Sequence, residues 1–165
     1  MASSWSLFIQ LVTKSSKLKL YRTVIRPIVT YASETWMLKE NIIQKLLVFE
    51  RKIFRGIFGA TKENQIWRIK NNEELDKLIK HENIVNYIKA QRLSWFDHVQ
   101  RMPETSAAKK LFKWNPLTTR PRGRPKHRWE DILKDLGQMK IKNLITCVQD
   151  RAKWKVVVEK ANTSK

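Results

Sequence analysis

The sequence predicts an all-α fold, in which a helical bundle is followed by a basic extended linker and by C-terminal helices. Three observations lead to this prediction. Apolar residues recur mostly at three- and four-residue steps, which is the spacing of one face of a helix. Only four glycines and five prolines interrupt 165 residues, so helices have few obligatory ends. No segment shows the alternation typical of a strand, and a hydrophobic content of 42% is enough for a core.

The N-terminal third predicts three helical segments. Residues 5–12 form a short apolar patch without a preceding basic residue, which favours a buried helix over a signal peptide. A helix is expected over residues 17–36, with a kink or break at Pro27, which lacks a backbone donor. A long helix is expected over residues 40–58, ended by Gly59. Its apolar stripe leaves Glu50 on the other side and consists of Ile42, Ile43, Leu46, Leu47, Phe49, Ile53, Phe54, Ile57 and Phe58.

The middle of the chain predicts three more helices. Asn72 is expected to cap a helix whose first turn holds acids that the helix dipole favours, and whose buried side is Leu75, Leu78 and Ile79. Residues 82–102 form the next helix, which Pro103 ends. Its expected buried stripe is Ile84, Val85, Ile88, Trp95, Val99 and Met102. Thr105 is then expected to cap a short helix that runs to Trp114.

Residues 115–128 are the predicted linker, because they contain three of the five prolines. A helix is expected to restart at Trp129 and to pause at Gly137, and a last one to cover residues 142–160, with Asp150 and Arg151 as a local pair or cap. We therefore divide the chain into an N-terminal extension (1–16), a helical region (17–114), the linker (115–128) and a C-terminal helical segment (129–165).

The charge of the chain points to a polyanionic partner. Lys and Arg number 34 against 15 Asp and Glu, a formal net charge of +19, which attracts nucleic acid first and an anionic membrane second. No run of eighteen apolar residues supports a membrane span. The single cysteine, Cys147, excludes an internal disulfide and a cysteine-rich zinc site, and its apolar surroundings predict a buried thiol in a reducing compartment. We expect no metal, no cofactor and no secretion.

The linker is the strongest candidate binding site. The stretch "RPRGRPKHRW" carries the cations Arg120, Arg122, Arg124, Lys126 and Arg128. If each neutralised one phosphate, the logarithm of the binding constant would fall with the logarithm of salt concentration with a slope of about −4 to −5. The core Arg122-Gly123-Arg124-Pro125 also resembles an AT-hook, in which such a segment lies in the narrow minor groove of A·T-rich DNA. A nuclear import signal has a similar composition.

Seven tryptophans are the second signal for nucleic acid, because aromatic side chains beside Lys or Arg stack on bases. Most of them, such as Trp95 on its apolar stripe, are expected to pack in the core. Trp114 and Trp129 flank the linker and are the better stacking candidates.

Four ordered motifs resemble the C-terminal part of non-LTR retrotransposon reverse transcriptases of the insect and animal type. They are "KLKLYRTVIRPIVTYASETW" (17–36), "RLSWFDHVQRM" (92–102), "RPRGRPKHRWEDILKDL" (120–136) and "DRAKWK" (150–155). The resemblance implies a polymerase thumb followed by downstream segments. It implies that Lys19, Arg22 and Arg26 follow a template–primer duplex, and that Arg92, His98 and Arg101 hold flanking RNA or target DNA.

The chain also departs from the family pattern. A polymerase palm needs carboxylates for two Mg²⁺ ions, and this sequence contains no Asp-Asp pair. Asp97 stands before His98 where the family often has glycine, and the Cys/His knuckle of some relatives is absent. We therefore expect binding of RNA–DNA hybrid, RNA or DNA without catalysis, with any palm supplied in trans and a nuclear or otherwise cytoplasmic location.

Several alternatives remain open. One is a protein that binds A·T-rich DNA through the linker, and another is a decayed mobile-element fragment without selected activity. A nuclease that used Glu104, Glu130, Asp131 and Asp135 is disfavoured, because no strand offers the usual scaffold. The stripe of residues 40–58 also predicts self-association of a chain that lacks its palm.

Overall fold

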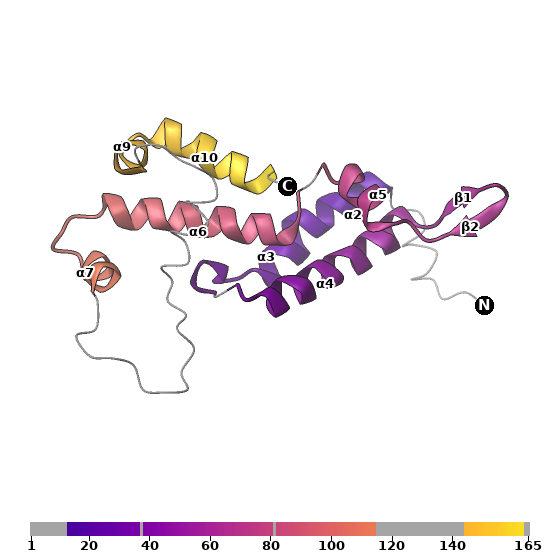
Figure 1. Ribbon diagram of the computed structural model, residues 1–165, viewed down its shortest axis with the longest axis horizontal. Coiled ribbons are helices and arrows are strands. Elements are labelled where there is room, and N and C mark those ends of the chain that lie inside the picture. The colour runs from indigo at the N-terminus through magenta and orange to yellow at the C-terminus, as the bar shows by residue number, and fades with distance from the viewer. Residues whose placement is uncertain (1–12, 37, 81, 115–143, 164–165) are drawn as a thin grey trace. The chain divides into compact units, whose positions relative to one another are not determined.

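The computed structural model describes residues 13–36, 38–80, 82–114 and 144–163 (Figure 1). These residues are mostly helical, and their one sheet has two strands, which confirms the all-α prediction. The chain divides into two compact units: an N-terminal unit of Met1–Tyr31 and Glu40–Ile84, and a C-terminal unit of Ala32–Lys39 and Val85–Lys165. The sequence pattern had placed residues 17–114 in one region. None of the described helices is long and apolar enough to cross a bilayer.

The first helix of the N-terminal unit begins and ends earlier than predicted. It consists of α2 (Lys14–Leu20), the π-helical turn η1 (Tyr21–Ile25) and α3 (Arg26–Val29). The wide turn ends two residues before Pro27, whose missing N–H leaves a helical carbonyl without its usual donor. Ala32 then adopts a left-handed conformation (φ 54°) before the short 3₁₀ helix η2 (Ser33–Thr35). The prediction of one helix to residue 36 is therefore wrong at its C-terminal end.

The long helix α4 (Glu40–Phe58) has the predicted bounds, and Gly59 ends it with a positive φ of 71°. The next helix, α5 (Asn72–Leu78), is capped one residue earlier than predicted, by the capping box of Asn71 and Glu74. Leu75 and Ile79 are buried as expected. Leu78 is largely exposed, which corrects its predicted place on the buried side.

The core of the N-terminal unit contains a buried carboxyl group. Tyr21, Phe54, Leu75 and Ile79 form the apolar cluster. Glu50 is 2% exposed, and it accepts hydrogen bonds from the Tyr21 hydroxyl (2.7 Å) and the Ile84 amide (2.8 Å). The prediction that Glu50 lies off the buried stripe of α4 is wrong, because these two donors stabilise its carboxyl group inside.

The apolar stripe of α4 is covered only in part. Of its nine predicted residues Phe54 is fully buried, most are half-buried, and Phe49 is exposed. Val48, beside it, is exposed as well. Self-association through this helix therefore stays a prediction, with Val48 and Phe49 as the apolar side chains most open to a second molecule.

A β-hairpin follows α4, where no strand was expected. Strands β1 (Thr61–Glu63) and β2 (Ile66–Arg68) pair antiparallel around a two-residue turn. The turn residues Asn64 and Gln65 both have positive φ, 49° and 65°, as the mirror-image turns of tight hairpins require. Sequence pattern missed the hairpin because its strands have three residues each and its turn lacks glycine.

Glu74 connects the hairpin to α5. Its carboxylate accepts hydrogen bonds from both terminal nitrogens of Arg68 (2.6 and 3.0 Å) and from the Asn71 amide (2.9 Å). The Arg68 guanidinium, followed by the amide, lowers the pKa of Glu74 to about 2. This contribution to stability is present above the ordinary carboxyl pKa of 4.5 and is lost as pH falls through about 2.

We therefore expect Glu74→Gln to lower the stability of the chain at pH 7 and to make much less difference at pH 2. Urea unfolding of both proteins across this pH range measures the difference. Glu73→Gln is the matched control, because Glu73 is an exposed acid in the same helical turn. A Glu74→Gln effect that is equal at both pH values would contradict the role of the ion pair.

The C-terminal unit is built on the long helix α6 (Ile84–Arg101). The short helix α7 (Ala107–Lys113) follows, with Ser106 rather than Thr105 at its N-cap position. The predicted last helix is two helices, α9 (Leu144–Gln149) and α10 (Arg151–Thr163). Asp150 separates them and accepts from the amides of Ala152 (3.0 Å) and Lys153 (3.2 Å), which confirms its capping role. Its charged partner is Lys153, at 3.1 Å.

Helix α10 lies beside α6 in this unit (Figure 1), and Trp154 of α10 belongs to the core between them. It packs with Leu93, Phe96, Val148 and Ala161, and its indole N–H donates to the Leu93 carbonyl (3.1 Å). Within the stripe predicted for α6, Ile84, Val85, Ile88 and Val99 are buried, whereas Trp95 and Met102 are half-buried. Cys147 packs against this core but is only partly buried.

Candidate nucleic-acid interface

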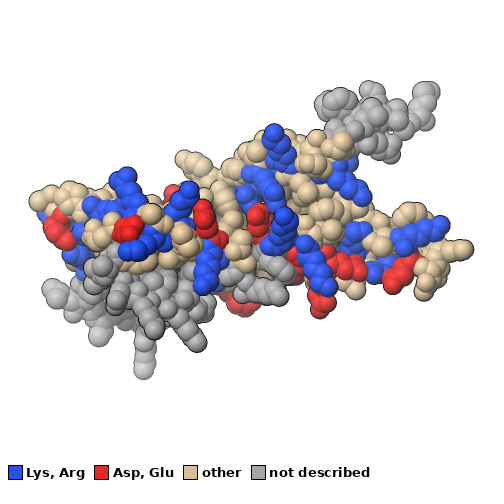
Figure 2. Space-filling view, turned by 90° about the horizontal axis from the view of Figure 1, so that it is seen from above, with Lys and Arg blue, Asp and Glu red and all other residues tan. Residues whose placement is uncertain are grey.

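The described surface is basic. Figure 2 shows Lys and Arg side chains spread over the face in view, with Asp and Glu among them. Exposed Lys and Arg clearly outnumber exposed acids, which among the described residues are Glu40, Glu63, Glu73, Glu104 and Glu159. The described part of the chain therefore has an excess of positive charge on its surface, which the exposed acids do not cancel.

The three predicted cations of the N-terminal unit do not form one exposed row. Lys19 is exposed on α2. Arg22 is paired with Glu82 (3.1 Å) and keeps about half of its side chain accessible. Arg26 is partly buried, and its charge acts on the pKa of both Tyr21 and Glu50. Lys19 and Arg22 thus remain accessible to a phosphate, whereas Arg26 faces the buried carboxyl group.

The predicted binding face of Arg92, His98 and Arg101 is largely structural. Arg92 is 3% exposed, so its guanidinium is not accessible to an external phosphate. This burial does not fit the predicted role of Arg92 in holding RNA or DNA. Arg101 pairs with Asp97 and also donates to the Val148 carbonyl (3.5 Å), which links α6 to α9. His98 is exposed and is the one member of the three that a ligand reaches freely.

Asp97 has a structural role within the C-terminal unit. Its side chain is buried, and loss of solvation raises its pKa, while Arg101 acts in the opposite direction. The acid serves to hold Arg101 against α9. Asp97 points inward and His98 outward, so the two do not form a pair in which the carboxylate orients the imidazole.

The C-terminal end of α7 leads into the linker with exposed cations. Buried Lys109 fastens the helix, because its ammonium donates to the carbonyls of Gln100 (2.9 Å) and Met102 (2.8 Å). Lys110 and Lys113 are exposed, and Lys113 also pairs with Glu104 (2.7 Å). Trp114 is exposed as well. Its indole is accessible for stacking, as its place beside the linker predicted.

Helix α10 presents a second set of cations. Its buried side is Trp154 and Ala161, and its solvent side carries Arg151, Lys153, Lys155 and Lys160. Lys153 lies 3.1 Å from Asp150, and Lys155 lies 3.9 Å from Glu159. Exposed pairs of this kind are weak and exchange readily for a phosphate. The motif "DRAKWK" could have indicated this surface, because its three cations surround one buried tryptophan. These cations were not among the predicted site residues.

The linker site lies outside the described residues. This applies to the predicted binding residues Arg120, Arg122, Gly123, Arg124, Pro125, Lys126, Arg128 and Trp129. It applies equally to the apolar patch of residues 5–12, the helix expected from Trp129 and the acids Glu130, Asp131 and Asp135. Glu104, the described member of the nuclease alternative, is exposed and paired with Lys109 and Lys113.

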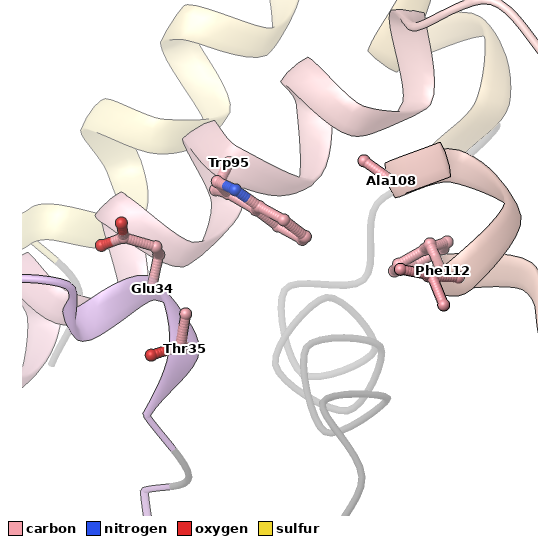
Figure 3. Close-up of a pocket in the computed structure, with 6 residues that line it drawn as sticks. Glu34, Thr35, Trp95, Ala108 and Phe112 are labelled. Carbon is pink, nitrogen blue, oxygen red and sulfur yellow. The ribbon is translucent and has the colours of Figure 1, made fainter. Parts of the chain in front are cut away.

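An apolar pocket of about 350 Å³ lies between α6, α7 and η2 (Figure 3). Its described lining is Glu34, Thr35, Trp95, Ala108, Leu111 and Phe112. This lining includes one acid and no cation, so the pocket suits an apolar group and is a poor place for a phosphate. Among the described residues, no three His, Cys, Asp or Glu side chains are grouped to hold a metal ion.

Comparison with known proteins points to the origin of the chain. It is 24% identical over 158 residues to an uncharacterized, transposon-derived protein of Caenorhabditis elegans. The match covers 92% of this chain and 57% of that relative, so the chain spans little more than half of the relative's length. The similarity suggests a mobile-element origin. No protein-family model and no solved structure matches the chain.

Proposed function

We propose that the chain is a non-catalytic, nucleic-acid-binding part of a mobile-element protein. Lys and Arg side chains contact the phosphate backbone without reading base sequence. The observation that carries the proposal is the excess of exposed cations on folded helices, above all the solvent side of α10 and the end of α7. Such a surface binds polyanions and releases their counterions.

The order of the parts along the chain supports the proposal. Lys110, Lys113 and Trp114 directly precede the predicted linker, which adds five more cations, Arg120 to Arg128. The cations at the end of α7 are therefore followed in the sequence by those of the linker, and both groups suit a phosphate backbone. The exposed indole of Trp114 adds a stacking surface next to Lys113 in the sequence.

We further propose that the parent protein is a non-LTR retrotransposon reverse transcriptase. The four ordered motifs imply this origin, and the transposon-derived relative agrees with it. The chain would then hold template–primer or target nucleic acid for a polymerase palm supplied in trans, in the nucleus. It would have no enzymatic activity of its own.

Fluorescence anisotropy tests the proposal with the full chain and three fluorescent ligands of equal length: A·T-rich DNA, G·C-rich DNA and an RNA–DNA hybrid. We expect similar affinities for all three at each salt concentration, with a double-logarithmic salt slope of about −4 or steeper. Lys153→Gln/Lys155→Gln should reduce this slope by roughly 2, because each lost phosphate contact accounts for about 0.9.

The matched control is Lys45→Gln/Lys52→Gln, which removes the same charge from exposed positions of α4. It should leave the salt slope nearly unchanged. A strong A·T preference that Arg124→Ala abolishes would support the AT-hook alternative instead. No binding to any ligand at low salt would overturn the proposal and leave a decayed fragment as the better description.

A further inference from the structure

The hairpin of the N-terminal unit exposes a tryptophan. Trp67 is 68% exposed on β2, although it is the largest apolar side chain of this segment. Exposure of an indole leaves much apolar area in water, and such residues commonly serve binding. Its cross-strand partner is Lys62, which is exposed as well. An aromatic ring and a cation therefore lie side by side on a protruding element.

The register of the hairpin separates its two faces. Lys62 pairs with Trp67, while the neighbouring pairs are Thr61 with Arg68 and Glu63 with Ile66. Because successive side chains alternate between faces, Lys62 and Trp67 share one face and the other residues share the opposite one. Side chains directly opposite each other have their Cβ atoms about 5 Å apart. The acid of the hairpin, Glu63, belongs to the other face.

That other face fixes the hairpin to its unit. Arg68 donates to Glu63 and, at 2.6 and 3.0 Å, to both carboxylate oxygens of Glu74. Arg55 of α4 donates to the Asn72 side chain (2.6 Å) just beyond the hairpin. The Lys70 ammonium also donates to the Thr61 hydroxyl of β1, so each strand has a contact on this face. By the register, Lys62 and Trp67 lie on the opposite face.

We propose that the Lys62–Trp67 face is a stacking site for one unpaired base of a nucleic acid, with Lys62 at the adjacent phosphate. The inference rests on the proposed function and adds to it a preference for unpaired strands. A base offers its π-face only when it is not stacked within a duplex, and an aromatic ring beside a cation binds it with little regard to sequence. The strongly basic chain favours this occupant over a basic or neutral protein surface.

The test compares a single-stranded oligonucleotide with the same strand carrying abasic positions, and with a blunt duplex, by fluorescence anisotropy. Trp67→Ala should weaken binding of the normal single strand by about tenfold. It should change binding of the abasic strand and of the duplex by less than about twofold. Trp67→Phe should retain most of the affinity, since a phenyl ring still stacks. Ile66→Ala is the matched control, because Ile66 is 71% exposed on the opposite face.

The outcomes separate this inference from the proposed function. If the wild-type chain binds the single strand and Trp67→Ala binds it equally well, the stacking site is wrong while backbone binding stands. If the wild-type chain binds no nucleic acid, the proposed function itself has failed. Sedimentation velocity tests whether the Lys62–Trp67 face binds a second copy of the chain instead. If Trp67→Ala abolished self-association and left the nucleic-acid affinity unchanged, the proposal would be overturned.

Discussion

Replacing Glu50 with alanine is expected to destabilise the N-terminal unit by about 3 kcal/mol. The substitution leaves the Tyr21 hydroxyl and the Ile84 amide without their acceptor inside the unit. Each buried donor that loses its partner costs roughly 1–3 kcal/mol. The cavity left by the removed carboxyl group adds to this cost.

The contribution of Glu50 to stability should depend on pH, because burial shifts the pKa of its carboxyl group. Burial raises the pKa of Glu50, while hydrogen bonds from Tyr21 and Ile84 lower it, and burial has the larger effect. A carboxyl group with a raised pKa contributes most to stability below its ordinary value of 4.5, and this contribution is lost as pH rises through the raised value. The difference between wild type and Glu50→Ala should therefore shrink from pH 4 to pH 8.

Urea unfolding followed by circular dichroism measures the loss, and hydrogen exchange of the Ile84 amide locates it. Lys52→Ala on the solvent side of the same helix is the control and should change the free energy of unfolding by less than about 0.5 kcal/mol. Glu50→Gln keeps the shape of the side chain and one acceptor oxygen, so it should lower the free energy of unfolding less than Glu50→Ala does. Equal stability of Glu50→Ala and wild type would refute the buried network.

Replacing Trp154 with alanine is expected to cost the C-terminal unit about 3–5 kcal/mol. The side chain is 2% exposed and contacts Phe96, with ring centroids 6.0 Å apart. Its loss opens a cavity between α10 and α6 and leaves the Leu93 carbonyl without the indole donor. We expect α10 to lose its attachment to α6, because Trp154 and Ala161 are its fully buried residues.

Two further variants separate packing from hydrogen bonding. Trp154→Phe keeps much of the ring contact but loses the hydrogen bond to Leu93. The lost bond should lower the free energy of unfolding by about 1 kcal/mol, and the smaller ring should lower it further. Val156→Ala, at an exposed position of the same helix, should be close to neutral. Thermal unfolding of the three variants gives the ranking. A Trp154→Ala protein as stable as Val156→Ala would show that this tryptophan does not hold the unit together.

The spacing of apolar residues predicted the long helices well, because helical periodicity depends on residues that are close together in the sequence. The bounds of α4 needed only its apolar spacing and Gly59, and α6 ended before Pro103 as expected. Short elements were harder. The hairpin of residues 61–68 depends on two turn residues with positive φ and on the ion pair of Arg68 with Glu74. Neither feature can be recognised from the sequence of its six strand residues.

The sequence by itself determined the all-α class, the basic charge and the cluster of cations in the predicted linker, because these follow from composition and from local spacing. Only the tertiary structure decided which charged residues are accessible. Glu50 is buried because donors 29 and 34 residues away reach it. Arg92 and Lys109 are buried too, whereas His98 on the same helix as Arg92, and Lys110 next to Lys109, are exposed. A helical pattern shows which side chains share a face, but the partner that covers this face comes from a distant part of the chain. For the same reason Trp67 and Lys62 became a candidate site only once the register of the hairpin was known.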